Sequence, residues 1–173
     1  MSAFINKSIK RLGVNSYIII FLFIGQSYAF GQNIPSVQME SIDGTRVHSE
    51  EVFPLGRPTL LVFWATWCNH TTTGLSNIQD DYLDEWQEEF DLNIVAVSVD
   101  DAKTYNRAVS VANSNGWDFD IYLDKNGDFK RAMGVNNAPH VVLINAEREV
   151  VWQQPAFMNG DEDIIQEELE KFQ

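Results

Sequence analysis

The sequence has almost no cysteine. Cys68 is the one thiol among its 173 residues, so no disulfide can form within the chain. In an exported protein, a single leftover cysteine indicates pairing with another molecule or a reactive thiol. The alternative is a buried and inert side chain, because cysteine packs like a small hydrophobic residue. The residues around Cys68 must therefore distinguish these two interpretations.

The start of the sequence also lacks an apolar run that could span a bilayer. Its apolar run, YIIIFLFI at residues 17–24, has eight residues, whereas a spanning helix needs about 20. Three basic residues precede this run: Lys7, Lys10 and Arg11. Small residues at alternate positions follow it in Ala29-Phe30-Gly31, as at a cleavage site. We therefore predict a secretory signal peptide at 1–31 and a mature domain at 32–173.

This prediction places the domain in the periplasm or on the extracellular side of a bacterial membrane. The alternative is an uncleaved anchor, in which case only this first segment would contact the membrane. Basic residues are scarce beyond it: nine Lys and Arg stand against 25 Asp and Glu, a net charge of −16. Such a charge argues against nucleic acid and anionic membranes as partners, because phosphate binding needs a basic surface.

The remaining sequence contains a regular alternation of apolar strands and amphipathic helices. The predicted strands are 37–41, 45–48, 59–64, 93–99, 119–123, 141–144 and 149–152. The predicted helices are 71–90, 105–112, 129–133 and 161–172, with Asp100 or Asp101 capping the second. A strand–helix alternation implies a parallel sheet core with right-handed crossovers. The predicted fold is therefore α/β, a three-layer α/β/α domain with a mixed central sheet and an N-terminal β-hairpin.

Cys68 stands between the buried strand 59–64 and the helix 71–90. It is therefore expected at the carboxyl end of a central strand, where open α/β sheets place their active sites. It is also expected near a helix N-terminus, which stabilises an anion and favours the thiolate. Trp64, Thr66 and Trp67 would form the rim of this site. These surroundings favour a reactive thiol over an inert one.

Three segments carry a resemblance to a known family. They are LLVFWATWC at 60–68, NIVAVSVD at 93–100 and GVNNAPHVVLIN at 134–145. On these segments, residues 35–173 resemble the thioredoxin family, of the exported TlpA/ResA type of thiol-disulfide oxidoreductase. The resemblance implies a thioredoxin-like fold with Pro139 in the cis form beside Cys68. It also implies that the backbone of Ala138 pairs with an incoming peptide. Trp64 and Trp67, on the rim of the site, are predicted to contact that peptide.

The departures from the family pattern concern the second half of its motif. Where the family has C-x-x-C, this sequence has Cys68-Asn69-His70-Thr71. Gly74 replaces a glutamate that helps to move protons in such relatives, and Ser76 replaces a proline. Cys68 could attack a disulfide, but Thr71 cannot resolve the mixed disulfide that forms. We therefore predict monothiol exchange or disulfide isomerisation with protein thiols, protein disulfides or a low-molecular-weight thiol as partners.

His70 and Thr71 are the residues predicted to tune this thiol. The resemblance implies that a histidine at position 70 stabilises the attacking thiolate, and the Thr71 hydroxyl could add a hydrogen bond to the sulfur. The alternative is that Asn69 and His70 are ordinary exposed residues. In that case the chain is a redox-inactive thioredoxin-fold module that binds a peptide or partner protein on the same surface.

A further alternative is copper or zinc handling by Cys68, His70 and His140, since thiolate and imidazole bind both metals. His140 directly follows Pro139, but a histidine satisfied by the core or by solvent is the simpler interpretation. No cofactor is predicted. Peroxidase activity is a minor option, because Ala65 stands where peroxiredoxins have a threonine three residues before the attacking cysteine.

Overall fold

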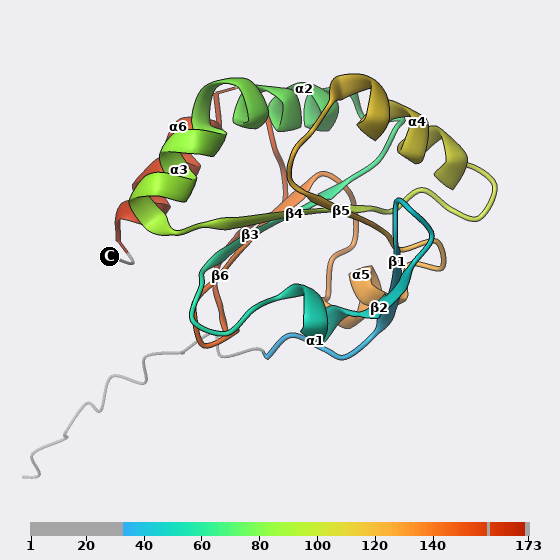
Figure 1. Cartoon of the computed structure of the whole chain (residues 1–173), viewed down its shortest axis with the longest axis horizontal. Helices are drawn as coiled ribbons and strands as arrows, with labels where there is room; N and C mark the ends of the chain where they lie inside the picture. Colours follow the sequence, from blue (N-terminus) through green and yellow to red (C-terminus); the bar gives the residue numbers. More distant parts are fainter. Residues whose placement is uncertain (1–32, 159, 172–173) are drawn as a thin grey trace, which may run out of the picture.

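The computed structural model describes residues 33–158 and 160–171, so the predicted signal peptide lies outside the described residues. Seven strands form one sheet in the order β2-β1-β5-β4-β3-β6-β7 (Figure 1). Their bounds are β1 Gln38–Ser41, β2 Arg46–His48, β3 Thr59–Trp64, β4 Asn93–Ser98, β5 Asp120–Leu123, β6 His140–Ile144 and β7 Val150–Gln154. Strands β3, β4 and β5 are parallel, whereas the other neighbouring pairs are antiparallel. The predicted mixed sheet with its N-terminal hairpin is confirmed.

Helices cover both faces of this sheet (Figure 1). On one face lie α2 Asn69–Asn77, η1 Ile78–Tyr82, α3 Leu83–Phe90, α4 Tyr105–Asn115 and α6 Glu162–Glu170. On the other lie two short helices, α1 Ser49–Val52 and α5 Asp128–Ala132. The architecture is therefore the predicted three layers. The sequence does not predict α1, because its four residues are too few to show a helical periodicity. Among the described residues, no helix combines the length and apolarity that crossing a membrane requires.

Strand β3 is the centre of the molecule, and all six of its residues are buried. Its side chains alternate between two cores. Leu60, Val62 and Trp64 pack under α2, α3 and α4, whereas Leu61 and Phe63 pack toward α1 and α5. Because both faces are apolar, a slip of one residue along the neighbouring strands would change every contact. This burial fixes the point at which the chain leaves β3 and therefore the position of Cys68.

The predicted helix 71–90 is wrong in two respects. It begins at Asn69, directly after Cys68, and it is divided by the π-helical turn η1. In η1 the backbone N–H of Leu83 bonds to the carbonyl of Ile78, five residues earlier. The wider turn brings Leu83 into the core and leaves Tyr82 only half-buried. A regular α-helix would have buried Tyr82 with Ile78 and Trp86, because side chains four apart share a face.

Candidate functional site

Cys68 sits at the junction between β3 and α2. Its backbone N–H donates to the Ala65 carbonyl at 3.0 Å, which closes a turn over residues 65–68. Cys68 is the N-cap residue of α2, and its side chain is half-buried. The thiol is therefore accessible and stands at a helix N-terminus, where free backbone N–H groups favour a negative charge. This is the position that the sequence predicts.

The two tryptophans of this segment have different environments. Trp67 is 63% exposed, next to Cys68, and is available for contact with another molecule. Trp64 is fully buried and meets Trp117 edge-on, with ring centroids 5.1 Å apart. The prediction that Trp64 contacts a substrate is wrong. Trp64 is the last residue of β3 and faces the core beneath the helices, while the turn carries Trp67 outward.

Thr71 is fully buried, and its hydroxyl oxygen has no hydrogen-bond partner among the described residues. The predicted hydrogen bond from this hydroxyl to the Cys68 sulfur is therefore not made. Thr71 lies on the buried side of α2 with Gly74 and Leu75, at helical spacings of three and four. A buried hydroxyl without a partner is unfavourable. Position 71 therefore offers no hydrogen-bond partner to a polar side chain.

Gly74 is in close contact with Phe157, which is itself fully buried. A Cβ added at position 74 would lie 2.3 Å from Cε1 of the Phe157 ring. No real contact is that short, so any side chain here would have to displace the ring. This contact explains physically why position 74 has no room for the acid that the family resemblance would place there.

His70 and Pro139 complete the surface around Cys68. His70 is exposed in the first turn of α2. The Ala138–Pro139 peptide bond is cis, and Pro139 is half-buried directly before β6. Because β6 runs antiparallel to β3 with His140 opposite Phe63, Pro139 lies beside the end of β3 from which the Cys68 turn departs. The backbone of this turn and that of Ala138 therefore belong to the same edge of the sheet.

His140 does not join this group. Its partner Phe63 belongs to the core that faces α1 and α5, whereas α2 covers the opposite face. The His140 ring is buried, and its Nε2 lies 3.2 Å from Oε1 of Gln153. Burial lowers the pKa of His140, and the hydrogen bond to Gln153 partly opposes that shift. No three His, Cys, Asp or Glu side chains gather as a metal site within residues 33–158 and 160–171, so the structure does not bring Cys68, His70 and His140 together.

Asp100 is the residue of this site that the sequence did not reveal. It is 1% exposed and follows β4 at the same edge of the sheet as Cys68. Its carboxylate accepts hydrogen bonds from the backbone N–H and the hydroxyl of Thr66, at 2.9 and 2.7 Å. The predicted cap of α4 by Asp100 or Asp101 is wrong, because the N-cap residue is Thr104 and it has no side-chain cap bond. Asp101 accepts from the backbone N–H groups of Lys103 and Thr104, just before the helix begins. An aspartate directly after a buried strand next to the Cys68 strand was the available signal.

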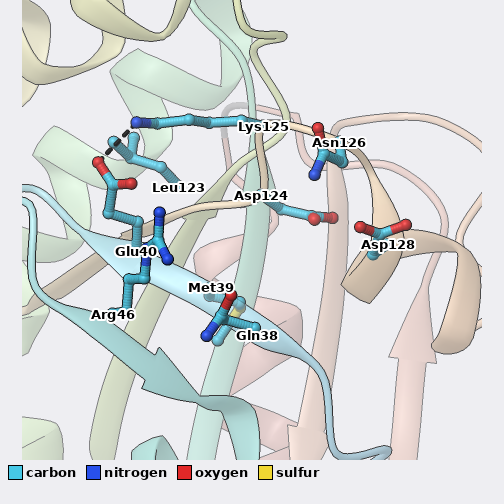
Figure 2. A pocket seen from close by; sticks show the side chains of 9 residues that line it. All are labelled: Gln38, Met39, Glu40, Arg46, Leu123, Asp124, Lys125, Asn126 and Asp128. Atoms are coloured by element: carbon cyan, nitrogen blue, oxygen red, sulfur yellow. Dashed lines mark hydrogen bonds and ion pairs between the residues drawn. The ribbon is translucent and has the colours of Figure 1, made fainter.

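A polar cavity of about 190 Å³ lies farther along the sheet, between β1, β2, β5 and the start of α5 (Figure 2). Its charged groups are largely paired. Lys125 forms an ion pair with Glu40 at 2.5 Å, and its ammonium group lies 3.6 Å from the centre of the Tyr105 ring. Asp124 accepts from the backbone N–H groups of Phe129 and Lys130. None of its lining residues belongs to the Cys68 turn or α2.

Comparison with known proteins agrees with this geometry. A model of the AhpC/TSA family matches residues 30–153. The chain belongs to the AhpC/TSA family. Among curated proteins, it is 22% identical over 135 residues to the thiol:disulfide interchange protein DsbE of Haemophilus influenzae, covering 78% of this chain and 70% of that protein. It is 28% identical over 127 residues to the thiol-disulfide oxidoreductase ResA of Oceanobacillus iheyensis, covering 71% of this chain and 63% of ResA.

Solved structures show that the fold is thioredoxin-like, as the resemblance implies. A thioredoxin-like protein from Porphyromonas gingivalis superposes with a TM-score of 0.70 and is 31% identical, covering 80% of this chain and 90% of that one. A DsbE-type thiol:disulfide interchange protein from Chlorobium tepidum also gives a TM-score of 0.70, at 20% identity, covering 82% and 95%.

Proposed function

We propose that this protein is an exported thiol-disulfide oxidoreductase that works through a single cysteine. The observation that carries the proposal is the placement of its only thiol. Cys68 is accessible at the N-terminus of α2, while the position of a second thiol holds the buried Thr71. Related proteins named for thiol:disulfide interchange support the reaction class.

The proposed reaction has two steps that balance. The Cys68 thiolate attacks one sulfur of a disulfide, a new S–S bond forms, and the other sulfur leaves as a thiolate. Cys68 is then held in a mixed disulfide, because Thr71 has no thiol with which to attack it. A thiolate from outside, either a protein cysteine or a small thiol, attacks the partner's sulfur and releases the Cys68 thiolate. The net result is exchange or isomerisation rather than reduction by the protein alone.

Other residues have supporting roles in this proposal. His70 contributes a charge or hydrogen bond that favours the thiolate. Exposed Trp67 supplies apolar contact area beside the sulfur. Ala138, which is buried, and the cis Pro139 lie directly before β6 at the same end of the sheet, and in this proposal the backbone of Ala138 pairs with a peptide substrate.

The test is to incubate the domain 32–173 with glutathione disulfide and to follow its mass. We expect the protein to gain one glutathione and to keep it until a second thiol is added. Cys68→Ser should gain none. Iodoacetamide should also alkylate Cys68 in the folded protein, and Cys68→Ser should take up none. A thiol that neither exchanges nor alkylates in the folded protein would overturn the proposal.

The exposure of Trp67 favours a second candidate function, a redox-inactive module that binds a peptide or partner protein. Large exposed aromatic side chains are frequent at protein interfaces. This module would retain its partner in Cys68→Ser and lose it in Trp67→Ala. Under the exchange function, Cys68→Ser would instead lose the partner, because the mixed disulfide could not form. The two variants therefore distinguish the two candidate functions.

Export is part of the proposal and has its own test. The run of basic residues, apolar residues and small residues before Gln32 supports a signal peptide at 1–31. Expression of the full chain in a bacterium should yield a protein whose N-terminus, determined by mass spectrometry, is Gln32. An intact Met1 on membrane-bound protein would instead indicate an anchor.

A further inference from the structure

The turn that presents Cys68 is held from a neighbouring strand. Residues 65–68 form the only link between β3 and α2, and Thr66 is the second residue of this turn. Oδ2 of Asp100 accepts the Thr66 backbone N–H at 2.9 Å, and Oδ1 accepts the Thr66 hydroxyl at 2.7 Å. Two bonds to the same residue define both the position and the orientation of its peptide group. The carboxylate therefore acts on the turn as a two-point clamp.

The surroundings of Asp100 show that this clamp is buried and specific. Asp100 and Thr66 are 1% and 6% exposed. The Ser98 hydroxyl lies 3.0 Å from Oδ2 of Asp100 and 3.1 Å from its backbone nitrogen. Within the described part of the chain no lysine or arginine forms an ion pair with Asp100. Its carboxylate thus depends on neutral donors, two of which belong to the turn that carries Cys68.

Burying an acid costs more desolvation free energy than burying a neutral side chain, so stability alone does not account for an acid at this turn. A neutral side chain could satisfy the Thr66 N–H with less desolvation. Bonds to an ionised acceptor are about twice as strong as neutral ones, and so they hold the turn more firmly. We propose that Asp100 is a positioning residue for Cys68, holding the turn so that the sulfur meets a disulfide in line.

This inference rests on the proposed exchange function. In the exchange step, the Cys68 thiolate bonds to one sulfur of glutathione disulfide while the old S–S bond breaks and a glutathione thiolate leaves. The three sulfurs must approach a line, and small displacements of a reacting group lower such rates strongly. Alkylation by iodoacetamide has no comparable constraint from a bulky leaving group. Loss of the clamp should therefore slow exchange more than alkylation.

The experiment compares Asp100→Asn with a matched control, Asp124→Asn. Asp124 is also a buried aspartate, 3% exposed, directly after the neighbouring strand β5, but its carboxylate bonds to the start of α5. Asparagine has nearly the same shape and retains only one acceptor oxygen. A second pair tests the other partner: Thr66→Val removes the hydroxyl and Thr66→Ser keeps it.

Two readouts are needed. The first is the mobility of a nitroxide attached to Cys68, which labels one site because the chain has one thiol. The second is the ratio of the rate constants for glutathione disulfide and iodoacetamide, measured where the thiol is fully ionised. We expect Asp100→Asn and Thr66→Val to raise label mobility and to lower the ratio about tenfold. Asp124→Asn and Thr66→Ser should stay within about twofold of the parent protein.

The outcomes separate this inference from the function on which it rests. Unchanged mobility and an unchanged ratio in Asp100→Asn would overturn the positioning role, whatever the parent protein does. An equal loss in Asp124→Asn would also overturn it, because the effect would then be one of general stability. A parent protein that never exchanges, combined with a mobile label in Asp100→Asn, would overturn the exchange function while supporting the clamp.

Discussion

The outer and inner sides of the first turns of α2 differ in which parts of a dithiol site they contain. The outer side carries the accessible Cys68 and the exposed His70, next to exposed Trp67. The inner side carries Thr71, with its unpartnered hydroxyl, and Gly74 against the Phe157 ring. The proposed attacking thiol therefore lies toward the surface, whereas position 71, where a resolving thiol would stand, lies in the core. A reactive thiol can remain on the surface while the packing of Gly74 against Phe157 leaves no room for an acid in the core beneath it.

Restoring a thiol at position 71 is the strongest test of this comparison. In Thr71→Cys, the new thiol would lie three residues from Cys68, the spacing from which a resolving cysteine attacks. A mixed disulfide with glutathione should then be released at least about 100-fold faster, because the attack becomes intramolecular. The measurement is the lifetime of the glutathione adduct by mass spectrometry.

Thr71→Val is the matched control for that variant. It preserves the shape of the side chain but has no thiol, so the adduct should remain long-lived. It also removes the unpartnered hydroxyl and should raise the free energy of unfolding by about 1 kcal/mol. An adduct of Thr71→Cys as persistent as that of Thr71→Val would show that position 71 cannot reach the sulfur.

Gly74 tests whether the inner side is closed by packing. Gly74→Ala places a Cβ 2.3 Å from the Phe157 ring. Overpacking of this kind costs about 1–3 kcal/mol, and the better helix propensity of alanine returns at most about 1 kcal/mol. We expect a net loss of about 1–2 kcal/mol in denaturant unfolding, and a larger loss for Gly74→Glu.

The control for Gly74 is a double-mutant cycle with Phe157→Leu, which removes the ring that the new Cβ would meet. The loss caused by Gly74→Ala should shrink markedly in that background. If the loss is the same with and without the ring, Phe157 is not what excludes a side chain at position 74.

Local sequence patterns predict much of this fold, because its strands and helix ends are determined largely by residues that are neighbours in the sequence. The run TLLVFW is buried on both faces in β3, and Gly116, with φ of 63°, ends α4 in the left-handed conformation typical of a glycine after a helix. The same patterns place Cys68 correctly, since a strand end and a helix start bracket it. The order of these elements predicts a three-layer α/β domain, and the resemblance of three segments to the thioredoxin family implies the thioredoxin-like topology.

The errors arise where contacts are distant in sequence. The bonds between Thr66 and Asp100 span 34 residues, and the contact of Gly74 with Phe157 is longer still. Trp64 and Trp67 look equivalent in the sequence, but the end of β3 separates a core residue from a surface one. Neither residue type nor periodicity carries these relations, because they depend on which strands become neighbours.

His70 tests the outer side by charge alone. His70→Gln keeps a polar side chain and removes the charge that an imidazole can carry. Because His70 is exposed, its interaction with the thiolate is screened and should be worth no more than about 1 kcal/mol. We expect alkylation of Cys68 to slow about two- to fivefold. His48→Gln, on the distant strand β2, should change nothing, and an equal effect in both variants would remove His70 from the site.

His140 provides the smallest effect and shows that the two faces of the sheet differ. Burial lowers its pKa from the ordinary value of 6.5, so the native state favours the neutral ring. The unfolded chain therefore binds more protons as the pH falls below about 6.5, and stability should decrease there. Unfolding by urea between pH 7 and 5 should show this loss, and His140→Gln should reduce it. Because His140 faces away from α2, its replacement should leave the alkylation rate of Cys68 unchanged; a changed rate would place the ring on the Cys68 side after all.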